Sequence, residues 1–273
     1  MGIKGTFDSI DLDSKLFNTL IQKPPLWWEY IKANEKNDLH VDIRKDNYIN
    51  VYYKGGSIAK IGFDKRSQCF KAVTHHKYLG QSIEGKKSYV LFDLNEFESN
   101  VEGLKTNVMA MYNRNKINTE KCIQADMILN NPSIIDSEFQ YNGEDFKDLR
   151  IDLIELDNDF RINFIELKRI QDPRLVKRKN NPMRPEIISQ MEKYNLFINK
   201  YSAQLIEYYT KLIKLKQQLG IMRISLPENS ELKINLKPQL YIKDYETWNT
   251  RRCNRKKDIE ALLSDNNIDY LFK

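Results

Sequence analysis

The sequence predicts an α/β protein, with a mixed β-sheet flanked by helices and a small α+β unit before it. From residue 96 onward, segments of helical and strand character follow one another as helix, three strands, helix, strand and helix. Before that point, a helical stretch precedes short β-prone runs around a glycine-containing turn. We therefore expect two domains, an N-terminal α+β unit at residues 1–95 and a sheet covered by helices at residues 96–273.

The composition is typical of a globular protein in a reducing compartment. Hydrophobic residues make up 41% and charged residues 30% of the 273 positions, which is too apolar for a disordered chain. No run approaches the roughly 18 apolar residues of a membrane-spanning helix, and the N-terminus lacks the apolar segment of a signal peptide. The three cysteines are scattered and form no C-x-x-C pair, which argues against a disulfide framework and a structural zinc site. We expect a cytoplasmic protein with no membrane partner.

The net charge of +6 is compatible with a polyanionic partner. It is weak support by itself, because 44 basic residues are nearly balanced by 38 acidic ones. Nucleotide-binding motifs of the types G-x-x-x-x-G-K-[ST] and G-x-G-x-x-G are absent, as is the G-x-S-x-G nucleophile motif. The adjacent pair His75-His76 would point to opposite faces of a strand, which makes a shared metal improbable.

The N-terminal unit is expected to contain one helix and three strands. A helix over residues 11–20 is ended by Pro24-Pro25. Strands over residues 48–53 and 57–63 flank Lys54-Gly-Gly56, a turn that tolerates positive φ, and so predict a β-hairpin. A further strand is expected over residues 69–74.

The C-terminal domain is expected to begin with two helices, over residues 96–112 and 119–129. The three strand candidates that follow are residues 134–141, 149–156 and 160–170. Pro185-Glu186 then opens a long helix that runs to Gly220, a suitable C-cap. Because about 35 residues is long for one globular helix, we expect a break near residues 199–202. The last expected elements are a strand at residues 240–242, a helix at residues 258–263 and a strand at residues 270–272.

Two of these strands form a hairpin that carries charged side chains on an apolar face. Because side chains alternate along a strand, Asp152 lies on one face of the first strand, and Glu166 and Lys168 share one face of the second. If the turn centres on Asn158, Asp152 opposes Phe164, and Glu166 is its diagonal neighbour at about 7 Å. A register slip of one residue would move Asp152 to the other face, so the proposed pairing depends on the turn.

This trio suits phosphodiester hydrolysis. Two neighbouring carboxylates can share Mg²⁺, which prefers oxygen ligands, and the backbone carbonyl of Leu167 offers one more. A bound cation neutralises the scissile phosphate and activates water, while Lys168 stabilises negative charge in the transition state. The alternative is a structural salt bridge of Lys168 with Glu166 or Asp152 at a strand end. The geometry expected from the sequence leaves both interpretations open.

The arrangement resembles the PD-(D/E)xK nuclease superfamily. Members of this superfamily place an acid on one strand and E-x-K on the next in an αβββαβ core, as Asp152 and Glu166-Leu-Lys168 are placed here. Gln190-Met-Glu-Lys-Tyr194, on the following helix, is similar to the Q-x-x-x-Y motif of the RecB-like branch. The resemblance implies a restriction-endonuclease-like αβββαβ core over residues 115–245, with Gln190 and Tyr194 assisting the site.

The resemblance also implies an acidic residue on the helix before the sheet. Glu120 is the first candidate for this additional metal ligand and Asp126 the second. The proline of the superfamily motif is missing, since Arg150-Ile151 precede Asp152. That proline is often absent in the superfamily. The N-terminal unit has no resemblance of this kind.

Two clusters of basic residues bear on nucleic-acid binding, because such groups hold phosphates without reading sequence. The first cluster follows the E-x-K strand and consists of Arg174, Lys177, Arg178, Lys179 and Arg184. The second consists of Arg251, Arg252, Arg255, Lys256 and Lys257, and a solvated helix start is the preferred interpretation for it.

The leading hypothesis is a Mg²⁺- or Mn²⁺-dependent nuclease that hydrolyses DNA, which is favoured over RNA. The superfamily implies a role in restriction, phage defence or repair. One rival is a nuclease-like fold that has lost catalysis and serves as a nucleic-acid-binding or assembly subunit. Another is a protein-interaction module whose E-x-K is a salt bridge. Self-association and a partner protein are left open by the sequence.

Overall fold

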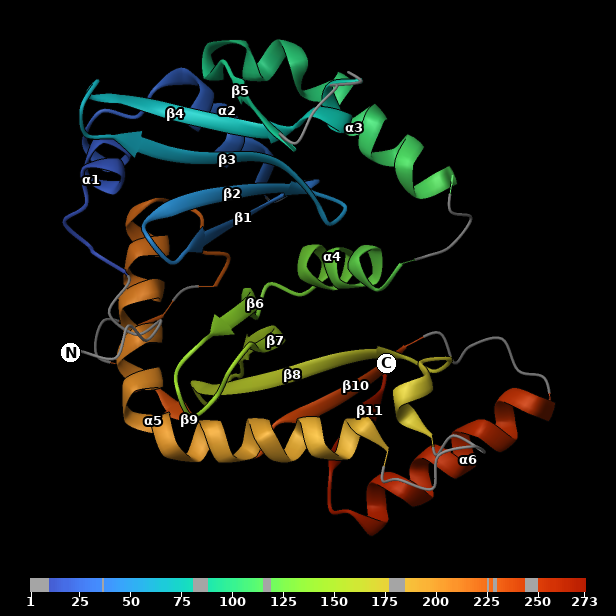
Figure 1. Ribbon diagram of the computed structural model, residues 1–273. Coiled ribbons are helices and arrows are strands. Elements are labelled where there is room, and N and C mark those ends of the chain that lie inside the picture. Colours follow the sequence, from blue (N-terminus) through green and yellow to red (C-terminus); the bar gives the residue numbers. More distant parts are fainter. Residues whose placement is uncertain are drawn as a thin grey trace. The chain divides into compact units, whose positions relative to one another are not determined.

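The computed structural model describes residues 10–35, 37–80, 88–114, 119–176, 185–224, 226–227, 230–243 and 250–273 (Figure 1). The chain forms two compact units. The N-terminal unit comprises Phe7–Pro132 and Tyr208–Ser225, and the C-terminal unit comprises Ser133–Glu207 and Leu226–Lys273. Residues 96–132 therefore belong to the same compact unit as the N-terminal sheet. The sequence predicted them as part of the second domain.

The N-terminal unit consists of helices packed on an antiparallel sheet. Its helices are α1 (Lys15–Gln22), α2 (Leu26–Glu35), α3 (Phe97–Arg114) and α4 (Glu120–Asn130), with the 3-10 turns η2 (His76–Leu79) and η3 (Leu94–Glu96). Its strands are β1 (Leu39–Arg44), β2 (Tyr48–Tyr53), β3 (Gly56–Asp64), β4 (Cys69–His75) and β5 (Tyr89–Phe92). Within the described residues each strand pairs with the next, in the order β1-β2-β3-β4-β5.

Local sequence explains much of this sheet. The β2–β3 turn places Lys54 at φ 43° and Gly55 at φ 79°, so the predicted hairpin with positive φ is confirmed. One face of the sheet is apolar and buried, and Val41 and Val51 pair across it. The expected third strand is β4. By contrast, α2, β1 and β5 were not predicted. Pro25 opens α2 and accepts a hydrogen bond from the Trp28 N–H, where the sequence analysis assigned it only to the end of a helix.

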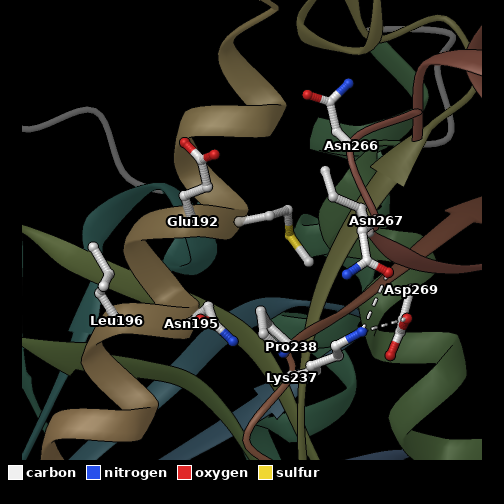
Figure 2. A pocket seen from close by; sticks show the side chains of 10 residues that line it. Glu192, Asn195, Leu196, Lys237, Pro238, Asn266, Asn267 and Asp269 are labelled. Carbon is white, nitrogen blue, oxygen red and sulfur yellow. Dashed lines mark hydrogen bonds and ion pairs between the residues drawn. The ribbon is translucent and has the colours of Figure 1, made fainter. Parts of the chain in front are cut away.

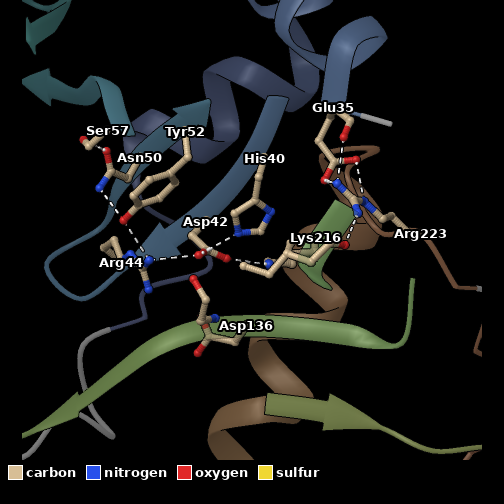
Figure 3. A network of polar contacts seen from close by, with 12 residues as sticks. Glu35, His40, Asp42, Arg44, Asn50, Tyr52, Ser57, Asp136, Lys216 and Arg223 are labelled. Atoms are coloured by element: carbon tan, nitrogen blue, oxygen red, sulfur yellow. Dashed lines mark hydrogen bonds and ion pairs between the residues drawn. The ribbon is translucent and has the colours of Figure 1, made fainter. Parts of the chain in front are cut away.

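The N-terminal unit also buries a polar network (Figure 3). Asp42 on β1 is fully buried, and its Oδ2 accepts from Arg44 Nη2 at 2.8 Å and lies 2.9 Å from His40 Nε2. Lys216 Nζ approaches Asp42 Oδ1 at 3.2 Å. Burial alone would raise the pKa of Asp42, but the charges of His40, Arg44 and Lys216 hold it well below 3.8. Buried charges are tolerated when they are paired in this way.

A second ion pair in this unit joins helix ends that are distant in sequence. Arg223 Nε donates to Glu35 Oε1 at 3.0 Å, and Arg223 Nη1 donates to the Ile128 carbonyl at 2.6 Å. The Arg223 side chain thereby satisfies the last carbonyls of α4 and holds the end of α2. We interpret these contacts as structural.

The C-terminal unit is built on a mixed sheet. Its strands are β6 (Ile134–Tyr141), β7 (Leu149–Leu156), β8 (Arg161–Arg169), β9 (Lys233–Ile234), β10 (Gln239–Lys243) and β11 (Asp269–Phe272). The order in the described residues is β11-β10-β8-β7-β6, with β9 also pairing with β8. The β6–β7 and β7–β8 pairs are antiparallel, whereas β8–β10 and β10–β11 are parallel. The predicted mixed α/β architecture is therefore observed.

The helices of this unit are α6 (Thr250–Asp265), the 3-10 turn η4 (Pro173–Leu175) and the first part of α5 (Glu186–Gln218). Tyr201 in α5 has non-helical backbone angles, φ −113° and ψ 19°, which confirms the predicted break near residues 199–202. At its end, Gly220 has φ 72° and donates to the Gln217 carbonyl at 3.0 Å, which confirms the predicted glycine cap. Figure 1 shows the first part of α5 running alongside β8, and Gln190 and Tyr194 of α5 contact Glu166 of β8.

Candidate active site

The β7–β8 hairpin sets the positions of the predicted site residues. In its turn, Asp157 Oδ1 accepts from the backbone N–H groups of Asp159 and Arg161, both at 2.9 Å, and Phe160 has φ 58°. The observed pairs, such as Ile154 with Phe164, shift the predicted register by two residues. The predicted register is therefore wrong. An even shift keeps each side chain on its face, and continuing the observed register sets Asp152 directly opposite Glu166.

Three oxygen atoms converge on the ammonium group of Lys168. Its Nζ donates to Glu166 Oε1 and, at 2.8 Å, to the carbonyl oxygen of Leu167. Asp152 Oδ2 lies 3.8 Å from the same nitrogen and accepts from the Leu167 N–H at 2.9 Å. Lys168 and Glu166 are 1% and 2% exposed, whereas Asp152 is half-buried and keeps access to solvent. The structure thus brings together the four residues expected to form the catalytic centre and to supply its first oxygen ligands.

Two side chains of helix α5 also contact the carboxylate of Glu166. Gln190 Nε2 donates to Glu166 Oε1 at 2.7 Å and to the Tyr194 hydroxyl at 2.7 Å. The Tyr194 hydroxyl lies 2.9 Å from Glu166 Oε2 and also contacts the carbonyl of Arg150. Gln190 and Tyr194 are four residues apart and so share one face of α5. Gln190 Oε1 is buried and has no hydrogen-bond partner among the described residues.

Burial disfavours the charged forms of both acids. Burial, with the charge of Asp152 as a further cause, raises the pKa of Glu166 to about 7. Burial also raises the pKa of Asp152, although the charge of Lys168 opposes this. The pKa of Tyr194 is raised, first by burial and then by Glu166, so its hydroxyl keeps its proton. Two carboxylates against one ammonium give the ionised cluster a formal charge of −1, which a cation would offset.

Glu138 on β6 is a third acidic residue at this site, and the sequence did not predict it. Ser137 pairs with Leu153 and Phe139 with Ile151, so the register sets Glu138 opposite Asp152. Its charge contributes to the raised pKa of Asp152. Glu138 also has φ 50°, a left-handed conformation that is strained for a residue with a Cβ atom, in the interior of a strand. The strand periodicity of the sequence gives no sign of this conformation.

No contact between the other predicted residues and this cluster is observed among the described residues of the C-terminal unit. Glu120 is the first residue of α4 and Asp126 lies 3.7 Å from Lys54, both in the N-terminal unit, so their role as metal ligands remains a prediction. Arg174 forms a two-point ion pair with Asp172, with Nη2 to Oδ2 at 2.6 Å and Nε to Oδ1 at 3.0 Å. The remaining basic residues of the first cluster, Lys177, Arg178, Lys179 and Arg184, lie outside the described residues.

A pocket among the described residues lies apart from this cluster. A pocket of about 460 Å³ opens between α5 and the segments that lead into β10 and β11, and Glu192, Lys237 and Asp269 are among the residues that line it (Figure 2). No residue of the cluster described above lines this pocket. Over the described ranges, no group of three or more His, Cys, Asp or Glu side chains is placed to hold a metal ion. The candidate site therefore rests on two carboxylates and a backbone carbonyl.

Comparison with protein-family models and with curated proteins finds no match for this chain. None of the helices in the part of the chain that the structure describes has the length and apolar content to span a lipid bilayer.

Proposed function

We propose that this protein is a metal-dependent nuclease that hydrolyses phosphodiester bonds of DNA, with Asp152, Glu166 and Lys168 as its catalytic centre. The observation that carries the proposal is the convergence of oxygens from Asp152, Glu166 and Leu167 on one point, where the ammonium of Lys168 now lies. Such a point suits a cation, and salt-bridge geometry alone does not require three converging oxygens.

These residues fit Mg²⁺ or Mn²⁺. Both ions prefer hard oxygen ligands, and Mg²⁺ commonly uses one or two carboxylates, with substrate oxygens and water completing its shell. Burial is the main cause of the raised pKa values of Asp152 and Glu166, and a bound cation would stabilise the charged forms of both carboxylates. The buried, unpartnered Gln190 Oε1 is one more oxygen beside Glu166.

A bound Mg²⁺ or Mn²⁺ would lower the pKa of a water molecule and neutralise the scissile phosphate. Asp152, the more exposed carboxylate, would face the substrate side. Glu166 is held at both oxygens by Gln190 and Tyr194, which limits its rotation and keeps it oriented towards Asp152. Lys168, displaced from its present oxygens, would place its charge beside the phosphate as negative charge develops in the transition state.

The finer fold assignment belongs to the same proposal. Apart from the two-residue strand β9, which lies between α5 and β10, the elements α4, β6, β7, β8, α5 and β10 follow the αβββαβ order of the PD-(D/E)xK superfamily. The antiparallel β6-β7-β8 strands and the parallel β10 beside β8 support a restriction-endonuclease-like core. The Gln190 and Tyr194 contacts to Glu166 support the RecB-like branch. Restriction, phage defence and repair are roles consistent with such an enzyme.

One observation favours a second candidate function. Lys168 is almost fully buried, and its ammonium already neutralises Glu166. If this pairing is permanent, the unit is a nucleic-acid-binding or assembly subunit without catalysis.

Cleavage of labelled single- and double-stranded DNA, with Mn²⁺, Mg²⁺ or EDTA, separates the two candidates. We expect metal-dependent cleavage by the wild type and its loss in Asp152→Asn and Lys168→Gln. Lys214→Gln, a change at an exposed lysine of α5 in the N-terminal unit, is the control that removes the same charge as Lys168→Gln. Salt-sensitive DNA binding without cleavage under any of these conditions would instead support the non-catalytic subunit.

A further inference from the structure

The second basic cluster forms the start of α6. Five of the seven residues from 251 to 257 are basic, and the first turn of the helix contains no acidic residue. Arg251 and Arg255 are four residues apart on one side of α6, as are Arg252 and Lys256. Arg251 and Lys257 are exposed.

Two physical effects disfavour this arrangement in isolation. Backbone N–H groups give the N-terminus of a helix a partial positive charge, so cations there are unfavourable. Like charges at i and i+4 also repel each other. Consistent with this, the pKa of Arg255 is lowered, first by burial and also by the charge of Arg251. An anion bound beside Arg251 would relieve both effects.

Arg255 anchors this end of α6 to the segment that follows the E-x-K strand. Its Nε donates to the Ile170 carbonyl, and its Nη2 donates to the Asp172 carbonyl at 2.7 Å. The Ile170 N–H in turn donates to the Lys243 carbonyl at 2.9 Å, which ties the same segment to the end of β10. The anchored segment begins two residues after Lys168.

The anchored segment also brings Arg174 close to the cluster. The Asp172 carboxylate accepts two hydrogen bonds from the guanidinium of Arg174, whose side chain is about one-third exposed. Burial would raise the pKa of Asp172, but the hydrogen bonds and charge of Arg174 lower it, and the charge of Lys168 lowers it further. Arg169 and Lys243 pair at the carboxyl ends of β8 and β10. The basic start of α6 is therefore fixed beside the candidate active site.

We propose that Arg251, together with Arg174, binds backbone phosphates of the nucleic acid next to the phosphate that is hydrolysed. This inference rests on the proposed nuclease function for its choice of ligand. Arg255 positions the helix, because its Nε and Nη2 donate to the Ile170 and Asp172 carbonyls and so join α6 to the segment after β8. Arg251 lies one turn earlier on the same side of α6 and is exposed to solvent. Arginine suits phosphate because its planar guanidinium can donate two parallel hydrogen bonds.

The test is the affinity of the full chain for a labelled 20-base-pair DNA duplex in EDTA, measured at several salt concentrations. EDTA prevents cleavage, so binding is read independently of catalysis. The variants are Arg251→Gln, Arg174→Gln and the control Lys257→Gln, which removes the same charge from an exposed position about 120° around α6 from Arg251.

Each arginine variant is expected to bind several-fold more weakly at low salt, with the salt slope of log K reduced by about one. Lys257→Gln should keep the wild-type slope. Equal effects of all three variants would mean general charge attraction and would overturn the proposal. Wild-type binding by Arg251→Gln in a protein that cleaves DNA would overturn it while leaving the nuclease function intact. Absence of DNA binding by the wild type would count against both.

Discussion

Substitution of Lys168 by methionine should tighten the binding of Mn²⁺ while abolishing DNA cleavage. The ammonium of Lys168 contacts the oxygens that we assign to the metal, so the two cations compete for one position. Methionine has a similar length and carries no charge. The prediction distinguishes a metal site from a permanent salt bridge, because only a metal site gains affinity when the ammonium is removed.

The 3.8 Å separation of Lys168 Nζ and Asp152 Oδ2 gives the size of the expected change in Mn²⁺ affinity. Coulomb's law gives an attraction of about 4 kcal/mol at an effective dielectric constant of about 20 and about 1 kcal/mol at that of water. Asp152 is half-buried, so the attraction that the metal must overcome lies between these limits. Taking the lower limit, Lys168→Met should lower the Kd for Mn²⁺ by at least about fivefold.

Isothermal titration calorimetry with Mn²⁺ measures this directly, with circular dichroism to establish that each variant is folded. Asp152→Asn should lose the binding, and Lys214→Met should leave it unchanged. Unchanged or weaker Mn²⁺ binding by folded Lys168→Met would refute competition between the two cations. Without metal, Lys168→Met should be less stable than the wild type, because Glu166 loses its buried partner.

Three further predictions concern positions outside the immediate metal ligands. Tyr194→Phe removes the hydroxyl from Glu166 and Arg150, so urea unfolding should show a loss of about 1–3 kcal/mol, and cleavage should fall about 10- to 100-fold. In urea unfolding, the variant Glu138→Gly should be more stable than the variant Glu138→Ala by about 1 kcal/mol, because φ 50° is strained only for a residue with a Cβ atom. Equal stability of the two variants would contradict the strain. Asp42→Asn should cost about 3–5 kcal/mol at pH 7, because Arg44 and Lys216 lose a buried partner. The pKa of Asp42 in the folded protein lies well below 3.8, so its contribution is complete above that pH and is lost as pH falls through the folded value. Urea unfolding at descending pH should therefore show the difference between wild type and Asp42→Asn shrinking below about pH 4, and a constant difference would refute the role of the ionised carboxylate.

Local periodicity was sufficient to predict the hairpin and the face of the sheet on which the candidate site residues meet. The alternation along β7 and β8 places Asp152, Glu166 and Lys168 correctly even though the register differs by two residues from the predicted one. The difference arises in the turn, where the Asp157 side chain binds two N–H groups and Phe160 adopts positive φ. Phenylalanine gives no sequence signal for that conformation.

Sequence periodicity could not predict contacts between segments that are distant in the chain. Glu138 neighbours Asp152 only through the pairing of β6 with β7. Asp42 acquires its partner Lys216 from a helix more than 170 residues away in sequence. Likewise, the sequence favoured a solvated start of α6, whereas in the structure Arg255 donates to the carbonyls of Ile170 and Asp172 after β8. Each case depends on tertiary packing and not on local propensity.

The most direct test of the central claim is a crystal structure of the protein soaked in Mn²⁺, with anomalous scattering recorded to locate the ion. We predict one anomalous peak coordinated by Asp152, Glu166 and the carbonyl of Leu167, with the ammonium of Lys168 moved away from that point. A peak elsewhere, or none at millimolar Mn²⁺ with Lys168 still bound to Glu166, would contradict a metal-dependent active site at this cluster.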